Sequence, residues 1–395
     1  MSWIEISFWI SFIIIVYAFL GYGLVLYTMV KIKRFIKPGH AIFDANFEPY
    51  VTLIIPCFNE AEILREKIAN CLQLNYPATK LSILFITDGS SDNSNAILED
   101  YPQIEVLHQN NRFGKSAAEN RAMKFVKTPY VIFSDANTMI NSEAVKNIVK
   151  HFKNATVGCV SGEKRIISEV ADTASAAGEG IYWKYESLLK RWDAELNSAV
   201  GAAGELVAFK SSLYTDLPED TILDDFMQSM QIAAKGYKIV YEPQAYALET
   251  ASVNIGEEFK RKVRICAGGW QAIIRLINKI HIEKTPLLFF QYVSHRVLRW
   301  TITPFLLISM FILNFMLAFD HQPLYQIIIA IQIAFYSAAI IGFVLENKKI
   351  RLKPVFVPYY FCMMNYAVIA GLLKFVSGKQ KATWDKAQRK TAVIN

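Results

Sequence analysis

Cysteine is scarce in this chain of 395 residues, and its five cysteines are scattered and form no CxxC pair. An odd, dispersed set of this kind is typical of reduced cytosolic thiols and argues against a disulfide framework or a cysteine-rich zinc site. The six histidines show no HExxH spacing, and no GxGxxG follows the first strand-like segment. These absences argue against a histidine-held metal centre and against a dinucleotide oxidoreductase.

Charge is also scarce, because only 19% of the residues are charged. The mean hydropathy of +0.23 is higher than that of an ordinary soluble enzyme, so we expect membrane segments. The net charge of +7 is spread over short basic clusters at 31–37, 260–264, 348–353 and 379–390. Basic clusters beside apolar segments suit anionic membrane lipids. No basic stripe carries regular aromatics, so no nucleic-acid partner is predicted.

The first long apolar run covers residues 6–30 and is long enough to cross a bilayer. Nothing basic precedes this run, whereas the cluster at 31–37 follows it. The positive-inside rule therefore places the N-terminus outside and the following domain in the cytoplasm, at an inner (plasma) membrane. These flanks are the reverse of those of a signal peptide, so we expect residues 1–44 to form a retained anchor and basic linker.

Residues 45–255 alternate short β-rich runs with helical patterns, as an α/β domain does. The strand candidates are 51–56, 81–87, 104–108 and 130–134. Helices are expected near 60–74, 92–100, 115–126, 172–192 and 225–235. This alternation predicts a Rossmann-like, mostly parallel sheet with helices on both faces.

A basic amphipathic pattern follows in residues 256–300 and is typical of helices that lie in a membrane surface. We expect the Gly268–Gly269 pair to kink this segment. Residues 301–345 contain two apolar runs, near 301–319 and 324–345, each long enough to be a transmembrane helix. The sequence therefore predicts a multi-pass membrane protein.

The segment 346–395 has two interpretations. If residues 355–376 span the membrane, the basic tail after them lies outside, against the positive-inside rule. If these residues form an interfacial helix, the tail stays in the cytoplasm. We prefer the interfacial helix for that reason.

Acidic residues follow two of the predicted strands. Asp88 comes directly after the run 81–87, and Asp135 follows the run 130–134. The carboxyl ends of strands in an open α/β sheet are the usual place for a ligand. Asp135 and Asn137 are spaced so that both side-chain oxygens can reach one hard cation. The alternative for these residues, and for Asp92, is ordinary turn and helix-cap chemistry.

Two further acids, Asp224 and Asp225, open the predicted helix at 225–235. One of them could act as a general base towards a hydroxyl group. Adjacent carboxylates raise one another's pKa, which would help such a base to work near neutral pH. The alternative is that both acids only stabilise the positive end of the helix dipole.

Lys115 lies in the segment RFGKS, which has some likeness to a phosphate-binding Walker loop. That loop needs glycine where Gln109 stands, so a nucleoside-triphosphatase loop is discounted. Lys115 can still meet a diphosphate, and the alternative is the start of a surface helix.

An ordered set of segments resembles the family 2 glycosyltransferases. The segments are PCFNE (56–60), TDGSSD (87–92), GKSAAEN (114–120), SDAN (134–137), GAAGELVAFK (201–210), the pair at 224–225, and AAKGYKIVYEP (233–243). The set is most similar to the processive, membrane-integrated branch of cellulose, chitin, hyaluronan and poly-N-acetylglucosamine synthases. The resemblance covers about residues 50–300. It implies a GT-A fold and inverting transfer from a nucleoside-diphosphate sugar, usually uridine-linked, with Mg²⁺ or Mn²⁺.

The resemblance also implies roles for particular residues. Asp225 would be the base, with Asp224 in the place of the family's glutamate, and Asp88 would hold the uracil. Asp135 would hold the metal and the diphosphate, with Asn137 as a second metal ligand. The other donor-binding residues would be Pro56, Asn59, Glu60, Lys115, Ala136 and Arg264.

The acceptor side of the resemblance departs from the family pattern. The family's QxxRW corresponds to Arg261–Ile265, which keeps the arginine as Arg264 but lacks the glutamine and the tryptophan. The alternatives for the missing tryptophan are Trp270 and the Arg299–Trp300 pair, although both are out of register. The residues assigned to the acceptor are Gly204, Glu205, Trp270, Tyr182 and Trp183. For the last two, packing in a core or at a membrane surface is the alternative.

Two enzymatic functions follow, and one that is not enzymatic. The first is synthesis of an extracellular or cell-surface polysaccharide, with a homo-oligomer or an export partner as companions. The second is transfer of a single sugar to a polyprenyl-linked or other lipid acceptor. The third is a membrane scaffold that has kept the fold and lost the chemistry, against which the intact Asp224–Asp225 pair and GKS segment argue.

Overall fold

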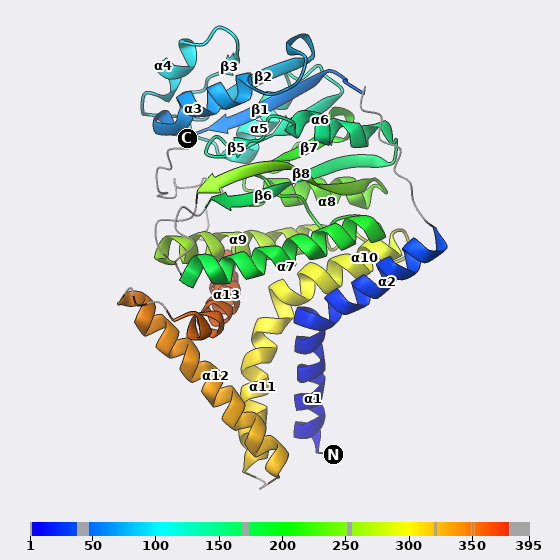
Figure 1. Ribbon diagram of the computed structural model, residues 1–395, viewed down its shortest axis with the longest axis vertical. Helices are drawn as coiled ribbons and strands as arrows, with labels where there is room; N and C mark the ends of the chain where they lie inside the picture. Colours follow the sequence, from blue (N-terminus) through cyan, green and yellow to red (C-terminus); the bar gives the residue numbers. More distant parts are fainter. Residues whose placement is uncertain are drawn as a thin grey trace.

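The computed structural model describes residues 2–37, 47–167, 174–250, 255–319, 322–348, 350 and 352–378. Figure 1 shows three tiers along the long axis of the molecule. A β-sheet with its helices forms one end. A layer made of α7 (Ala174–Leu196), α9 (Ile255–Leu276) and α10 (Pro286–Tyr292) lies beneath it. The helices α1 (Trp3–Val16), α11 (Thr303–Ala318) and α12 (Pro323–Asn347) extend away from that layer.

The sheet has eight strands in the order β3-β2-β1-β4-β7-β6-β8-β5. Their bounds are β1 Val51–Cys57, β2 Leu81–Thr87, β3 Glu105–Leu107, β4 Tyr130–Phe133, β5 Met139–Ile140, β6 Val157–Ile167, β7 Val207–Lys210 and β8 Lys238–Thr250. The pairs β3–β2, β2–β1, β1–β4 and β6–β8 are parallel, whereas β7 is antiparallel to both its neighbours and β5 to β8. The predicted mostly parallel sheet is confirmed.

Strand β1 shows why these residues form the centre of the sheet. All seven of its residues are buried, as expected for a strand covered on both faces. Leu53 and Ile55 point into one core, and Ile54 points into the other. The first core is closed by α3 (Ala61–Leu72), α4 (Ser94–Glu99) and α6 (Ala144–Val149). The second is closed by α5 (Lys115–Met123) and α8 (Asp224–Ala234).

The second core continues into the layer beneath the sheet. Ala272 and Leu276 of α9, and Leu288 and Tyr292 of α10, are buried in the same cluster as the strand residues. Sheet and layer therefore share one apolar interior.

Within the residues that the structure describes, four helices are long and apolar enough to cross a membrane: Trp3–Ile36, Pro286–Ala318, Pro323–Glu346 and Pro354–Val376. The first contains α1, a π-helical segment η1 (Tyr17–Gly21) and α2 (Tyr22–Ile36). The second contains α10, the π-helical segment η5 (Val293–Ile302) and α11. Both change direction at the π-helical segment, as Figure 1 shows. The second helix thus begins at Pro286, well before the predicted start near 301.

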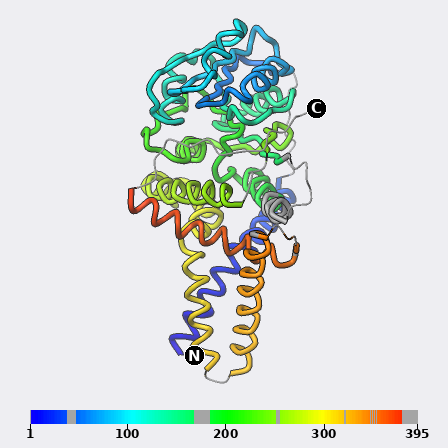
Figure 2. Tube along the Cα trace, turned by 90° about the vertical axis from the view of Figure 1, so that its left-hand side faces the viewer, coloured from blue at the N-terminus to red at the C-terminus, as the bar shows by residue number. Residues whose placement is uncertain are grey.

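The helix α13 (Lys353–Val376) covers the ambiguous apolar run. Figure 2 shows it crossing the direction of α11 and α12 and lying along α9. At Gly371 the two helices are so close that a Cβ atom would lie 2.8 Å from the backbone nitrogen of Ala267. The interfacial placement of this helix stays a prediction, and the basic tail from 379 onward lies outside the described residues.

The predicted kink at Gly268 and Gly269 is wrong, because α9 runs as one helix from Ile255 to Leu276. These glycines instead allow close packing. A Cβ on Gly268 would lie 2.7 Å from Leu223, and one on Gly269 would lie 2.7 Å from the ring of Trp300. The sequence alone does not tell whether a glycine pair bends a helix or lets another element pack closely against it; the tertiary contacts do.

Candidate active site

The acids predicted from the sequence meet at one edge of the sheet. Asp88 follows β2 and Asp135 follows β4, and both strands run parallel to β1 between them. Their carboxyl ends therefore lie at the same edge. Asp224 and Asp225 reach this edge from the first turn of α8.

Lys115 lies at the centre of these acids. Its Nζ is 2.9 Å from Asp135 Oδ1, 3.2 Å from Asp224 Oδ2 and 3.8 Å from Glu119 Oε1. Burial opposes the charge on Lys115, but the three carboxylates outweigh it and hold its pKa well above the ordinary value. We call Lys115, Glu119, Asp135, Asp224 and Asp225 the acid pocket. Glu119 was missed in the sequence, although it lies one helical turn after Lys115 in the GKSAAEN segment.

Asp225 has the properties of a general base. Burial, with Asp224 adding to the effect and Lys115 opposing it, raises the pKa of Asp225 to about 7. Gly204 lies directly beside it, since a Cβ at that position would be 3.1 Å from Asp225 Oδ2. A carboxylate with this pKa can take up a proton near neutral pH.

The predicted acceptor residues Gly204 and Glu205 lie in the segment that precedes β7. The backbone oxygen of Glu205 accepts a hydrogen bond of 3.1 Å from Ser134 Oγ, so the segment is fixed to the turn that carries Asp135. The Glu205 carboxylate is 2.6 Å from Lys164 Nζ, and Lys164 also pairs with Glu249. Burial raises the pKa of Glu205, but Lys164 outweighs it and the net shift is downward. Lys164 and Glu249 were missed because β6 and β8 were not predicted.

The turn that carries Asp135, Ala136 and Asn137 is held from behind by a buried lysine. Lys67 of α3 is fully buried, and its Nζ donates hydrogen bonds to Ser134 Oγ (2.9 Å) and to the backbone oxygen of Thr138 (2.7 Å). Burial lowers the pKa of Lys67. Ala136 is buried and Asn137 is half-buried beside Asp135. A lone lysine in a helix gives no sequence signal for this role.

Asp88 shapes the loop that leads into α5. Its carboxylate accepts hydrogen bonds from the backbone N–H groups of Phe113 (3.1 Å) and Gly114 (2.6 Å), and only 1% of its surface is exposed. This contact fixes the residues immediately before Lys115. Asp92 accepts from the backbone N–H groups of Ala61 and Ser94 (both 3.0 Å), the first residues of α3 and α4, which is turn chemistry; the N-cap position of α4 is Asn93.

The PCFNE segment ties the loops after β1 and β2 together. Pro56 is buried in β1, and Asn59 has a positive φ of 54°. The Asn59 Oδ1 accepts a hydrogen bond of 2.8 Å from the backbone of Ser91, while the backbone of Glu60 donates to Ser94 Oγ (3.0 Å). The donor-binding role of Pro56, Asn59 and Glu60 stays a prediction.

The remaining predicted residues lie on the layer beneath the sheet. Arg264 is half-buried on α9, one turn before Gly268, where that helix meets the start of α8. Trp270 donates from Nε1 to the backbone oxygen of Val368 in α13 (3.3 Å) and is not among the residues that line the cavity beside Asp225. The side chains of Tyr182 and Trp183 lie outside the described residues.

Comparisons with known proteins relate the sheet domain of this chain to a family of enzymes. Residues 52–213 match the family described as Glycosyl transferase family 2. Poly-beta-1,6-N-acetyl-D-glucosamine synthase of Staphylococcus aureus (strain COL) is 30% identical over 236 residues, which are 57% of this chain and 56% of the relative. The synthase of the same name from Staphylococcus epidermidis is 28% identical over 268 residues, or 64% of this chain and 62% of the relative. The chain thus spans less than two thirds of the length of these relatives.

Among solved structures, the chain is similar to a mannosyltransferase from Pyrobaculum calidifontis in complex with GDP-Man and Mn²⁺. The TM-score is 0.73 at 22% identity, and the match covers 94% of this chain and 99% of that chain. This likeness shows the fold, a GT-A sheet with appended membrane-type helices. Residues 52–213 thus match the glycosyl transferase family 2 model and lie in a domain of GT-A fold.

Proposed function

We propose that this protein is an inverting glycosyltransferase. It moves a sugar from a nucleoside-diphosphate donor, UDP-linked by preference, to a hydroxyl acceptor in the synthesis of a cell-surface polysaccharide. The proposal is based mainly on the arrangement of four side chains. In a family 2 domain, Asp135, Asp224 and Asp225 gather around Lys115 at the carboxyl edge of the sheet.

The proposed reaction uses Asp225 as the base. The acceptor hydroxyl oxygen forms a bond to the anomeric carbon while the bond from that carbon to the diphosphate oxygen breaks. The hydroxyl proton passes to the Asp225 carboxylate, and the nucleoside diphosphate leaves. The raised pKa of Asp225, about 7, suits a group that must accept this proton near neutral pH.

The donor diphosphate fits beside Lys115 and Asp135. Lys115 keeps its positive charge because its pKa is well above the ordinary value, so it can pair with phosphate oxygens. Among the residues that the structure describes, no three His, Cys, Asp or Glu side chains are grouped to hold a metal ion. Mg²⁺ or Mn²⁺ is often held by one or two protein oxygens plus substrate phosphates, a donor set that Asp135 and Asn137 fit. A bound cation would neutralise charge on the leaving diphosphate.

The acceptor approaches from the Gly204–Glu205 side. Gly204 leaves room next to Asp225, and Lys164 keeps the neighbouring Glu205 ionised and able to accept hydrogen bonds from sugar hydroxyls. This side of the sheet faces the layer of α7 and α9, from which the long helices extend (Figure 1). We place the catalytic domain in the cytoplasm and the N-terminus outside, with membrane lipids around α1, α11 and α12.

A second candidate is transfer of one sugar to a lipid-linked acceptor. In the described part of the chain, α1, α11 and α12 are the helices that run along the long axis (Figures 1 and 2). These helices are few for one chain to enclose a channel through which a polymer could cross the membrane. This observation favours either a second subunit for export or an acceptor that stays in the membrane.

Purified protein in lipid nanodiscs tests both candidates. UDP- and GDP-linked hexoses and N-acetylhexosamines are supplied one at a time, with Mg²⁺, with Mn²⁺ or with EDTA. The release of nucleoside diphosphate is then measured. We expect turnover with one UDP-sugar and its loss in EDTA. A ladder of products from labelled donor supports polymer synthesis, and a single lipid-soluble product supports the second candidate. No turnover with any donor in native lipid extract would contradict the proposed activity.

A further inference from the structure

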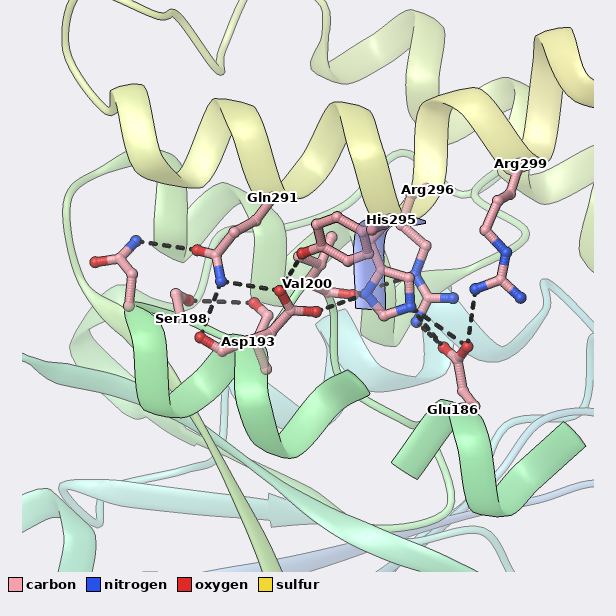
Figure 3. Close-up of polar contacts among 11 residues, drawn as sticks. Glu186, Asp193, Ser198, Val200, Gln291, His295, Arg296 and Arg299 are labelled. Carbon is pink, nitrogen blue, oxygen red and sulfur yellow. Dashed lines mark hydrogen bonds and ion pairs between the residues drawn. The ribbon is translucent and has the colours of Figure 1, made fainter. Parts of the chain in front are cut away.

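A second buried cluster of charged side chains, separate from the acid pocket, lies between α7 and η5 (Figure 3). Glu186 and Asp193 of α7 face His295, Arg296 and Arg299 of η5, and we call these five residues the junction cluster. His295 Nδ1 is 2.6 Å from Asp193 Oδ2. Glu186 carboxylate oxygens lie 2.6 Å from Arg296 and 3.3 Å from Arg299. The cluster attaches η5 to α7 through several ion pairs.

The N-terminal membrane-type helix joins the same cluster. Tyr22, at the start of α2, donates a short hydrogen bond to Asp193 Oδ1. In the neighbouring π-helical segment η1, the Tyr17 hydroxyl is 2.8 Å from Ser294 Oγ of η5. The two bends, η1 and η5, therefore pack against each other at the level where both helices meet the layer. π-helical segments are rare and frequently occur at functional sites.

One turn of η5 reaches from the junction cluster to the loop beside the base. Arg296 Nε donates a hydrogen bond of 3.3 Å to the backbone oxygen of Val200. The next residue, Gly201, has a φ of +87°, and a Cβ atom there would lie 2.2 Å from the ring of Phe226. Phe226 directly follows Asp225 in α8. Arg296 thus holds the loop against which the first turn of α8 packs.

Trp300, four residues after Arg296, also packs against Phe226. The two ring centroids are 5.2 Å apart, and the Arg296 guanidinium lies 5.1 Å from the Trp300 ring. Gly269 of α9 lies against the same ring. Trp300 is not among the residues that line the cavity beside Asp225. Trp300 therefore meets the base-bearing helix α8 through Phe226, next to Asp225.

We propose that Arg296 and Trp300 are positioning residues, through which the helix that enters the membrane sets the location of Asp225. This proposal rests on the proposed function. Arg296 and Trp300 contact both structures that surround Phe226, the loop at 200–201 and the start of α8. The junction cluster fixes Arg296 in turn to α7 and, through Asp193, to α2. A shift of about 1 Å in a catalytic group can reduce the rate about a hundredfold.

The first test compares Trp300→Ala and Trp300→Phe with Trp192→Ala in nanodiscs. Trp192 packs against Tyr27 of α2, so its removal deletes an indole at the same level of the molecule but away from the base. We expect Trp300→Ala to lower kcat on the order of tenfold to a hundredfold without raising KM for the donor. Trp300→Phe should restore most of kcat, and Trp192→Ala should keep it.

The pH–rate profile separates positioning from general damage. Loosening the packing around Phe226 admits water to Asp225, which lessens the effect of burial that raises the pKa of this acid. The acid limb of kcat/KM should therefore move to lower pH in Trp300→Ala and stay in place in Trp192→Ala. Equal kcat and equal profiles in the two variants would overturn the proposal. A rise in acceptor KM alone would also overturn it, because Trp300 would then be binding the acceptor.

Two further measurements complement these kinetics: the first does not depend on the folding of Trp300→Ala, and the second does not depend on turnover. Gly269→Ala would place a methyl group 2.7 Å from the Trp300 ring, which must then shift, and we expect a lower kcat at temperatures well below the melting temperature of the variant. Hydrogen–deuterium exchange of segments 200–206 and 222–230 should increase in Trp300→Ala relative to Trp192→Ala, and should stay near the wild-type level in Trp300→Phe. If the wild type shows no turnover, the proposed function fails. Unchanged exchange in these segments would then overturn the positioning role as well.

Discussion

The acid pocket and the junction cluster are two buried groups of charges with opposite balances. In the acid pocket, four carboxyl groups surround one lysine. In the junction cluster, two carboxylates face two arginines and a histidine. The acid pocket therefore has an excess of negative charge that a proton or a cationic ligand can reduce. The junction cluster is already balanced within the protein.

The pKa shifts of Asp225 and Glu186 reflect this difference in charge balance. Burial and Asp224 raise the pKa of Asp225 to about 7. Burial would also raise the pKa of Glu186, but Arg296, His295 and Arg299 bring it well below the ordinary value. Burial alone does not decide whether a carboxyl group is reactive; the number of nearby cations does. Perturbed acids with an uncompensated charge are typical of active sites.

The largest effect is expected from Asp225→Asn. The amide cannot accept the hydroxyl proton, so we expect kcat to fall by about a hundredfold to ten-thousandfold while the donor still binds. Steady-state kinetics with the active nucleotide sugar measure this loss. Asp216→Asn, an exposed acid near the same helix, serves as the control and should keep full activity. Unchanged kcat in Asp225→Asn would contradict the assignment of the base.

The next effect concerns stability and distinguishes the two clusters directly. Glu186→Gln leaves Arg296 and Arg299 buried without their carboxylate, so we expect a loss of about 3 kcal/mol in the free energy of unfolding. Asp224→Asn removes one negative charge from the acid pocket, where carboxyl groups outnumber cations, and should change the free energy of unfolding little or not at all. Chemical or thermal unfolding in detergent measures both. Similar losses in the two variants would refute the difference in charge balance.

A third prediction concerns pH. The base must be deprotonated, so kcat/KM should rise about tenfold per pH unit below pH 7 and level off above it. For stability the signs are opposite in the two clusters. Asp225 has a raised folded pKa, so its stabilising contribution is present at low pH and is lost as the pH rises towards 7. Glu186 has a depressed folded pKa, so its contribution is lost as the pH falls below the ordinary carboxyl range.

Much of the acid pocket could be predicted from the sequence, because it depends on local signals. Asp135 follows an apolar run that folds as a parallel strand, and Asp224 and Asp225 open a helix with a clear amphipathic pattern. Asp88, which follows a second such run, fixes the loop before Lys115. Lys115 and its neighbours also follow the order of a known family. Position along the chain was sufficient to predict that these residues meet.

The junction cluster could not be predicted in the same way. It forms between residues about a hundred positions apart, such as Glu186 and Arg296, and each looks alone like an ordinary surface charge on a helix. The wide turns of η5 have no sequence signature that would place Trp300 beside Phe226. The long strands β6 and β8 were missed for a related reason, since mixed polar and apolar residues hide a strand whose partners are distant.

The smallest effect is expected at the rim of the junction, where charge and burial can be separated. Arg34 of α2 and Glu195 of α7 form a bidentate pair, with 49% and 31% of their side chains exposed. Like Glu186 and Arg296, these residues form a carboxylate–guanidinium pair, but both side chains are accessible to water. Glu195→Gln should therefore cost less than about 1 kcal/mol in the free energy of unfolding, and less still at high salt. A loss in the free energy of unfolding as large as that expected for Glu186→Gln would contradict this prediction. It would mean that an exposed ion pair to α7 stabilises the protein as much as a buried one, so that burial is not the cause of the large effect in the junction cluster.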